Sequence, residues 1–138
     1  MNIEAIKDGI VIDHIQPGKA MQIYEMIGLG KLKSPVALIM NVQSAKMGRK
    51  DIIKIDQHIE LDLDVLGYIS PHITVDIVKD GKVVSKNHIE LPDQLTDILV
   101  CRNPRCITST EQEIHHRFRL TDRKNGVYRC IYCDTAAK

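Results

Sequence analysis

The four cysteines of this chain are the feature that most constrains its fold. They form two close pairs, Cys101 with Cys106 and Cys130 with Cys133, in the pattern C-x4-C, 23 intervening residues, then C-x2-C. Four thiolates complete a tetrahedral zinc shell and leave no open position for substrate, so such a zinc is structural. Two disulfides or unrelated buried thiols would also account for four cysteines, but close pairs far apart in sequence favour a metal. We therefore predict one structural zinc ion bound by these residues.

The start of the sequence favours the same interpretation. Met1 leads directly into Asn2-Ile3-Glu4, without the basic and apolar regions of a secretory signal. No apolar run approaches the ~18 residues of a membrane span. We expect a soluble cytoplasmic protein with no membrane segment, in a compartment that keeps thiols reduced and available for metal.

Length and composition suggest a modest aliphatic core. The 138 residues suit one ordinary domain or two small ones. With one Phe, four Tyr and no Trp, we expect the core to consist of Ile, Val, Leu and Met. The formal net charge is +1, divided into −3 over residues 1–100 and +4 over residues 101–138. The basic excess of the C-terminal part is too small to require a nucleic-acid partner.

Hydrophobic periodicity predicts five strands and two helices in the first part of the chain. Alternating or β-branched apolar runs indicate strands, and apolar residues at helical spacing indicate helices. Asp80-Gly81, between two such runs, is a strong signal for a two-residue hairpin. The expected strands are 9–15, 35–42, 50–55, 72–79 and 82–89, the expected helices are 20–27 and 62–68, and 43–48 is expected to be a loop.

The order of these elements, β-α-β-β-α-β-β, predicts an α+β fold. We expect an antiparallel, ferredoxin-like sheet with both helices on one face. We assign residues 1–93 to this domain and residues 94–138 to a small β domain resembling a zinc ribbon. Because the second domain is too short for a large core, zinc is expected to supply the missing folding free energy.

The residues show no catalytic constellation. The sequence has no Gly-x-Ser-x-Gly elbow, and zinc binding would leave no free cysteine as a nucleophile. A ligand site is more plausible, because Lys50, Lys54 and Lys86 lie on or beside expected strands and Asp13-His14 ends the first. Lys54 alternates with two isoleucines and therefore faces away from the core. Such lysines can bind phosphates, although ordinary solvated lysines would give the same pattern.

Basic residues around the cysteines leave two interpretations open. We interpret His115-His116 as the surface of a strand, because the four cysteines already complete a zinc shell. The arginines of this region could face nucleic acid, as in some zinc ribbons, or an acidic patch on a protein. They are Arg102, Arg105, Arg117, Arg119 and Arg129.

Several segments together resemble one family, the regulatory chain of aspartate carbamoyltransferase. The resemblance extends over essentially the whole chain, and the cysteine spacing fits the zinc site of the family. The segments are 3–7 (IEAIK), 11–15 (VIDHI), 47–55 (MGRKDIIKI), 99–107 (LVCRNPRCI) and 130–133 (CIYC).

This resemblance implies a non-catalytic subunit of pyrimidine biosynthesis. In the family, an N-terminal allosteric domain binds nucleotides and pairs with a second copy, while the zinc domain docks on the catalytic chain. Three regulatory dimers join two catalytic trimers; CTP inhibits, UTP assists in some members, and ATP activates. By resemblance, the base lies near Glu4, Ile6 and Val83, the ribose near Asp13 and Lys54, and the triphosphate near His14 and Lys86.

The chain departs from the family pattern at a few positions. Asp76 stands where the pattern has Asn, and Gly81 stands where an aromatic residue can border the base, so both bear on nucleotide preference. Asn103 falls in the loop that family members press against the catalytic chain, and Arg105 replaces a smaller polar residue there. Our leading hypothesis is a regulatory subunit that couples nucleotide binding to a partner enzyme. The alternative is a zinc ribbon that binds nucleic acid.

Overall fold

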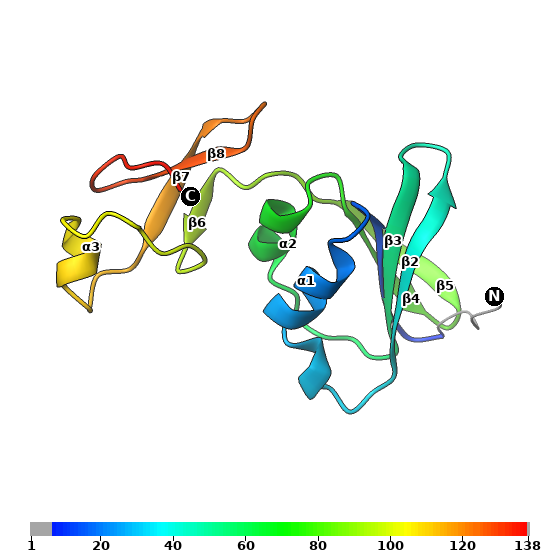
Figure 1. Ribbon diagram of the computed structural model, residues 1–138. Helices are drawn as coiled ribbons and strands as arrows, with labels where there is room; N and C mark the ends of the chain where they lie inside the picture. Colours follow the sequence, from blue (N-terminus) through cyan, green and yellow to red (C-terminus); the bar gives the residue numbers. More distant parts are fainter. Residues whose placement is uncertain (1–6, 138) are drawn as a thin grey trace. The chain divides into compact units, whose positions relative to one another are not determined.

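The chain divides into two compact units, Met1–Glu90 and Leu91–Lys138, each with its own antiparallel sheet (Figure 1). The computed structural model describes residues 7–137. Within that range, no helix is both long and apolar enough to cross a membrane.

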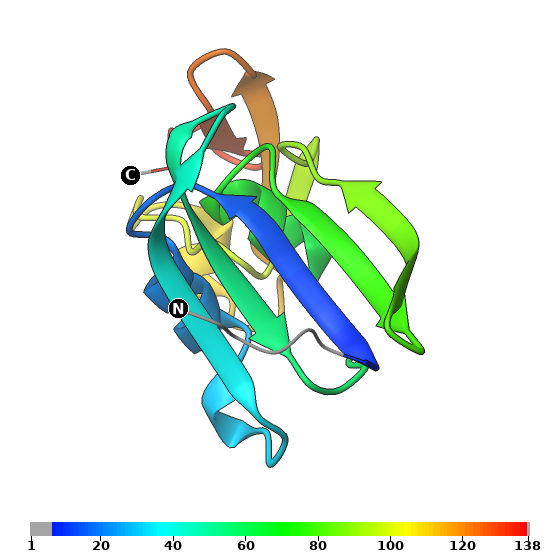
Figure 2. The same ribbon diagram turned by 90° about the vertical axis from the view of Figure 1, so that its right-hand side faces the viewer.

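The first unit is a five-stranded sheet in the order β2-β3-β1-β4-β5, and every neighbouring pair is antiparallel. Two helices cover one face, and none of the described helices covers the other, which faces the viewer in Figure 2. The predicted α+β arrangement is therefore confirmed. The elements are β1 (Gly9–Ile15), α1 (Ala20–Met26), a 3-10 turn (Leu29–Lys31), β2 (Val36–Ser44), β3 (Gly48–Ile55), α2 (Leu63–Ile69), β4 (Thr74–Lys79) and β5 (Lys82–His88).

Alternation along the strands separates the core face of this sheet from the open face. Ile10 and Ile12 of β1 and Ile53 and Ile55 of β3 are at most 1% exposed, and they pair directly across the two strands. Successive residues point to opposite faces, so the residues between these isoleucines point to the open face. The expectation of an aliphatic core is correct for this unit, except that the four methionines among its described residues do not contribute: Met21, Met26, Met40 and Met47 are exposed.

Local signals place several boundaries. Asp62 caps α2, because its side chain accepts hydrogen bonds from the backbone N–H groups of Asp64 and Val65. Asp80 and Gly81 both have positive φ, 51° and 75°, as the tight hairpin between β4 and β5 requires. The predicted loop 43–48 is shorter than expected, because β2 continues to Ser44 and β3 begins at Gly48.

Asp51 is a fully buried carboxylate that sequence patterning did not single out. It lies on the core side of β3 with 0% exposure. Its Oδ2 accepts hydrogen bonds from the N–H groups of Gly18 at 3.0 Å and Ala20 at 3.4 Å, and its Oδ1 accepts one from Asn41 at 3.0 Å. Burial of this charge is therefore compensated by three backbone donors. Asp51 joins the start of α1 and the irregular part of β2 to the strand that carries Lys50 and Lys54.

The second unit is a three-stranded sheet in the order β6-β7-β8. Its fully buried side chains include Leu95, Phe118 and Tyr128, so the expected aliphatic core is wrong here. The strands are short and contribute few side chains to the core, so two large aromatic rings occupy most of it. The Tyr128 hydroxyl also donates a 2.6 Å hydrogen bond to the carbonyl of Pro92. The elements are β6 (Gln94–Thr96), α3 (Ile107–Thr110), β7 (Arg117–Asp122) and β8 (Val127–Cys130).

The close approach of α2 to the chain after β5 gives a testable prediction. A Cβ atom on Gly67 would lie 2.3 Å from the carbonyl oxygen of Glu90 and 3.1 Å from Ile89 Cγ2. We expect Gly67→Ala to lower the free energy of unfolding of the first unit by about 1–3 kcal/mol, because backbone must shift. Helix propensity alone predicts the opposite sign, a gain of about 1 kcal/mol.

Urea denaturation followed by circular dichroism measures this difference. Gly30→Ala is the matched control, because its new methyl group would meet only the hydroxyl end of the Tyr24 side chain. We expect the control to change stability by less than about 0.5 kcal/mol. A Gly67→Ala protein as stable as wild type would contradict the close packing described.

Candidate metal centre and ligand-binding face

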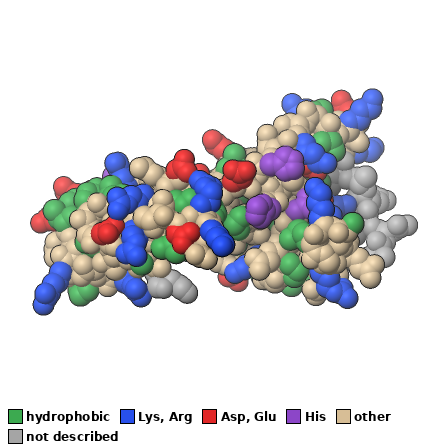
Figure 3. Space-filling model, turned by 90° about the horizontal axis from the view of Figure 1, so that it is seen from above, with side chains coloured by type: hydrophobic (Ala, Val, Ile, Leu, Met, Phe, Trp, Pro, Cys, Tyr) green, Lys and Arg blue, Asp and Glu red, His purple; other side chains and the backbone are tan. Residues whose placement is uncertain are grey.

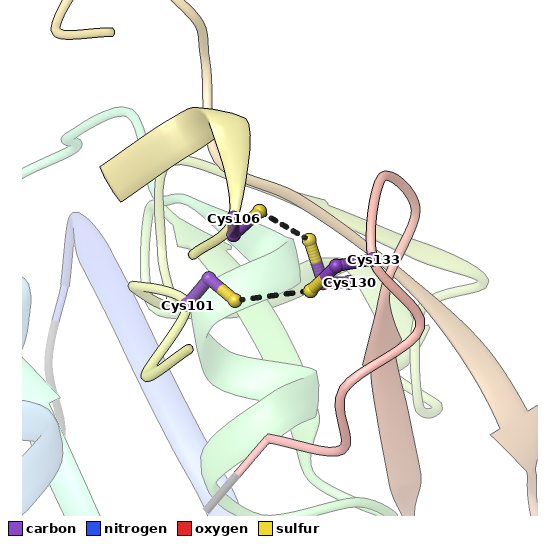
Figure 4. A group of neighbouring side chains, drawn as sticks. All are labelled: Cys101, Cys106, Cys130 and Cys133. Carbon is purple, nitrogen blue, oxygen red and sulfur yellow. Dashed lines mark hydrogen bonds between the residues drawn. The ribbon is translucent and has the colours of Figure 1, made fainter. Parts of the chain in front are cut away.

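The four cysteines converge from three separate segments of the second unit (Figure 4). Cys101 lies in the loop after β6, and Cys106 occupies the N-cap position of α3. Cys130 ends β8, and Cys133 follows in the next turn. Three of the four are buried and Cys133 is half-buried. The fold therefore brings together two pairs that are far apart in sequence.

The geometry of the sulfur atoms fits a tetrahedral metal ion. All four lie within 4.8 Å of one another, with 3.6 Å between Cys101 and Cys133 and 3.7 Å between Cys106 and Cys130. A tetrahedral shell with metal–sulfur bonds near 2.3 Å requires sulfur–sulfur distances of about 3.8 Å. A disulfide requires about 2.05 Å, and all four cysteines are free. Among residues 7–137, this is the one group of three or more potential ligands close enough to share an ion.

The thiols differ in their readiness to ionise. Burial raises the pKa of Cys101 to about 12 and also raises the pKa of Cys130. Hydrogen bonds from the Thr135 hydroxyl and backbone lower the pKa of Cys133 to about 6. Since only thiolates bind metal, an incoming ion must displace protons from Cys101 and Cys130.

Polar groups around the cluster hold the cysteines in place. The Thr108 hydroxyl donates to Cys106 Sγ at 3.1 Å, and the Cys101 N–H donates to His116 Nδ1 at 3.4 Å. His115 instead contacts Asp97, with 2.6 Å between Nδ1 and the carboxylate. The two histidines precede β7, so they were wrongly expected to lie in a strand, but His115 is exposed as expected and His116 is half-buried. His116 supports the metal loop from outside the sulfur shell.

Most of the residues predicted to bind nucleotide lie on the open face of the first sheet. Pairing between strands places Lys54 opposite Val11, Val11 opposite Asp76, and Asp76 opposite Lys86. Directly opposite residues share a face, so these four form one row from β3 to β5. Val83 lies further along β5 and is 56% exposed. Glu4 and Ile6 lie outside the described residues.

A second row on the same face contains Asp13 and the residues around it. Lys50 Nζ lies 3.0 Å from Asp13 Oδ1, and the two side chains are only 17% and 20% exposed. His14 Nδ1 is hydrogen-bonded to Thr74 Oγ1 at 2.9 Å, and His88 is paired with Thr74 from β5. His14 has a φ of 58°, at the point where the pairing of β1 and β3 shifts register. Sequence patterning cannot place Thr74 and His88 here, because their position depends on this register.

A cavity of about 720 Å³ opens beside the second row, where β1 ends. His14 and Thr74 form one side of it, and His72, His88 and Lys46 contribute further polar groups. Figure 3 shows histidine side chains gathered near basic side chains over the first unit. Glu90 also lines the cavity, so its wall carries one lysine, one carboxylate and three histidines. The site is concave and polar, and its size suits a small organic ligand.

Apolar side chains are also exposed on the second unit. Val100 is 75% exposed and Ile107 is 48% exposed, on either side of the first cysteine pair, and Tyr132 between the second pair is 45% exposed. Two of the arginines considered for nucleic-acid contact are engaged locally: Arg119 with the Asp134 carboxylate at 2.7 Å, and Arg129 with the Asp134 carbonyl at 2.9 Å. The surface around the two cysteine pairs therefore carries apolar as well as basic side chains.

Comparisons with known proteins agree over both units. The family model described as "Aspartate carbamoyltransferase regulatory chain, allosteric domain" matches residues 1–90, and the one described as "Aspartate carbamoyltransferase regulatory chain, metal binding domain" matches residues 93–138.

Similar chains from three bacteria carry the same name, aspartate carbamoyltransferase regulatory chain. The Clostridium botulinum (strain Hall) protein is 48% identical over 97% of this chain and 92% of its own length. The Clostridium acetobutylicum protein is 48% identical over 100% of this chain and 94% of its own length. The Bifidobacterium longum protein is 41% identical over 100% of this chain and 99% of its own length.

The ionisation of the cysteines predicts how metal affinity depends on pH. Cys101 and Cys130 have raised pKa values, so both are protonated at neutral pH without metal. Binding should release at least these two protons, so lowering the pH favours the metal-free form. Between pH 6.5 and 8 we expect affinity to rise by about a hundredfold or more per pH unit. Competition with a chelator at several pH values measures this slope.

The pH dependence of metal affinity can be compared between wild type and Thr135→Val. The substitution removes the hydroxyl that contributes most to the lowered pKa of Cys133, so a further proton must be released and the slope should steepen. Metal affinity that does not change with pH would show that the thiols are not the ligands.

Proposed function

The chain belongs to the aspartate carbamoyltransferase regulatory-chain family, and we propose that it binds nucleoside triphosphates on the open face of its first sheet and signals their presence to a catalytic chain. It is a non-catalytic regulatory chain with an allosteric domain and a metal-binding domain. CTP and UTP act as inhibitors and ATP as an activator in this proposal. Self-pairing of the first domain, residues 1–93, belongs to the same proposal.

The metal in this proposal is zinc. Four sulfur donors in a tetrahedral arrangement are typical of structural zinc, and the sulfur–sulfur distances agree with zinc–sulfur bonds. Cys101, Cys106, Cys130 and Cys133 would fill the coordination shell, which leaves zinc no position for a substrate. Its contribution is to hold three chain segments in one arrangement, within a metal-binding domain to which we assign residues 94–138.

Nucleotide binding is supported by the convergence of basic and polar side chains on one open surface. Lys54 and Lys86 stand in one row and Asp13 and His14 in the next, although they come from three strands. Ammonium groups suit phosphate and ribose oxygens, and the Asp13 carboxylate, already anchored by Lys50, retains acceptor capacity for ribose hydroxyls. We place the triphosphate towards His14 and Lys86, with the base near Val83 and near Glu4 and Ile6.

The second unit is the proposed contact with the catalytic chain. Exposed Val100, Ile107 and Tyr132 flank the cysteines, and apolar side chains next to a rigid metal centre are suited to a protein interface. Asn103 and Arg105 lie in the same metal loop. A nucleotide that binds the active and inactive assemblies unequally would shift their balance by ~1–3 kcal/mol, and the catalytic ligands would change nucleotide affinity by the same factor.

Lys86 provides the most direct test of the nucleotide site. We expect Lys86→Ala to weaken binding of both CTP and ATP about tenfold or more, because it removes a charge-assisted contact to phosphate. Isothermal titration calorimetry on the full chain with zinc bound measures both affinities. Lys31→Ala is the control, since Lys31 is an exposed lysine on the helix-covered side of the sheet.

Equal affinities for wild type and Lys86→Ala would remove Lys86 from the site. Binding that falls equally in the Lys31→Ala control would indicate general charge attraction rather than a defined contact. The alternative function is binding of nucleic acid by the second unit. Measuring nucleic-acid affinity at increasing salt concentration tests it, because binding through phosphates weakens steeply with ionic strength.

A further inference from the structure

Each cysteine pair is followed by a threonine two residues after its second member. Thr108 follows Cys106, and Thr135 follows Cys133. The distance between the threonine Oγ1 and the cysteine Sγ is 3.1 Å in the first case and 3.2 Å in the second. A thiolate bound to a metal has no proton to give, so each hydroxyl must be the donor when metal is bound. Both pairs therefore have the same O–H···S hydrogen bond.

The two threonines reach their sulfur atoms from different backbone conformations. Thr108 lies in the first turn of α3, whose N-cap is Cys106, and it is 5% exposed. Thr135 follows β8 in a turn where Asp134 has a φ of 63°, and its carbonyl accepts a 3.0 Å hydrogen bond from the Cys130 N–H. Because one segment is helical and the other is not, helix geometry alone does not explain the shared contact.

Thr110 shows the alternative for a threonine hydroxyl in α3. Its Oγ1 donates to the carbonyl of Ile107, three residues earlier, at 3.2 Å. This is an ordinary partner for a threonine in a helix. The hydroxyl of Thr108, two positions earlier in the same helix, instead lies against Cys106 Sγ. Thr110 is exposed, so it is a suitable control for a substitution in this helix.

The charge of the metal centre gives these donors a role. Four thiolates around one divalent ion leave a net negative charge, and three of the four cysteines are buried. Burying charge is costly unless hydrogen-bond donors compensate it. A hydroxyl group supplies a donor without adding a charge of its own. Its hydrogen bond also draws electron density from the sulfur, which then gives less of it to the metal.

We propose that Thr108 and Thr135 are positioning residues of the metal centre, whose hydroxyl groups hold the sulfur atoms of Cys106 and Cys133 towards the ion and withdraw charge from them. The inference rests on metal binding by the four cysteines, as in the proposed function, and does not depend on nucleotide binding. Loss of a group that hydrogen-bonds to a metal ligand typically lowers metal affinity ~10–100-fold. The two hydroxyls thus help to retain a metal that neither of them contacts.

The sulfur-to-metal charge-transfer absorption of the full chain loaded with Co²⁺ tests this inference. Co²⁺ is used because zinc, with its filled d shell, gives no visible spectrum. A thiolate that loses its hydrogen bond holds its electrons less tightly, so the band should move to longer wavelength in Thr108→Val and in Thr135→Val. It should stay at the wild-type wavelength in the control, Thr110→Val, and in Thr108→Ser and Thr135→Ser, which keep the hydroxyl.

Zinc retention is measured in parallel, by competition with a chelator at a single pH. Each valine variant should bind zinc about tenfold more weakly than wild type, whereas the control and the serine variants should stay close to the wild-type affinity. A band at the wild-type wavelength in both valine variants overturns the inference even where zinc affinity has fallen, because a fall in affinity alone indicates lost packing. A band that moves equally in Thr110→Val overturns it as well.

Failure of the proposed metal site is recognised separately. If wild type binds neither Zn²⁺ nor Co²⁺, the metal in the proposed function is wrong together with this inference. If circular dichroism shows that Thr108→Val does not fold, Thr108→Ala is measured instead, which removes the hydroxyl and adds no atoms at a buried position. Thr135→Val changes a half-buried turn and tests the second hydroxyl independently. Wild-type band positions in Thr108→Ala and Thr135→Val together overturn the inference.

Discussion

The mutual repulsion of four clustered thiolates is the constraint on which the second unit depends. Sulfur atoms within 4.8 Å of one another can all be ionised only if a cation lies between them. The same unit has strands of three, six and four residues, which cannot enclose a large core. A metal that joins the loop after β6, the start of α3 and the end of β8 therefore substitutes for packing. The positions of the exposed apolar side chains Val100 and Tyr132, which lie beside and between the cysteines, therefore depend on the metal.

In the first unit, the two faces of the sheet have different roles. Its core face is filled by isoleucines, and Asp51 ties α1 and β2 to β3 through three backbone hydrogen bonds. The opposite face is then free to hold charges, because neither helix needs it for burial. Lysines and carboxylates can converge there without disturbing the core.

The sequence predicts local features well and register-dependent features poorly. Asp80-Gly81, the alternation of β3 and the cysteine spacing each depend on near neighbours, and the structure has the expected hairpin, faces and cluster. Asp51 resembles any polar residue in an alternating strand, because its three donors come from distant segments. The pairing of Lys50 with Asp13 depends on a register shift in β1 that no composition rule indicates. The expectation of an aliphatic core failed in the second unit because its short strands supply few buried positions, and two of these hold the rings of Phe118 and Tyr128.

Regulation requires that nucleotide binding to the first unit changes the activity of a catalytic chain that contacts the second unit. Aspartate saturation curves of the enzyme reconstituted from catalytic chains and this chain, with and without saturating CTP, UTP or ATP, test this most directly. We expect the curves to shift with nucleotide for wild type and to shift less for Lys86→Ala at the same subsaturating nucleotide concentration. Identical curves with and without every nucleotide, from an enzyme that still contains both chains, would contradict it and reduce this chain to a structural spacer.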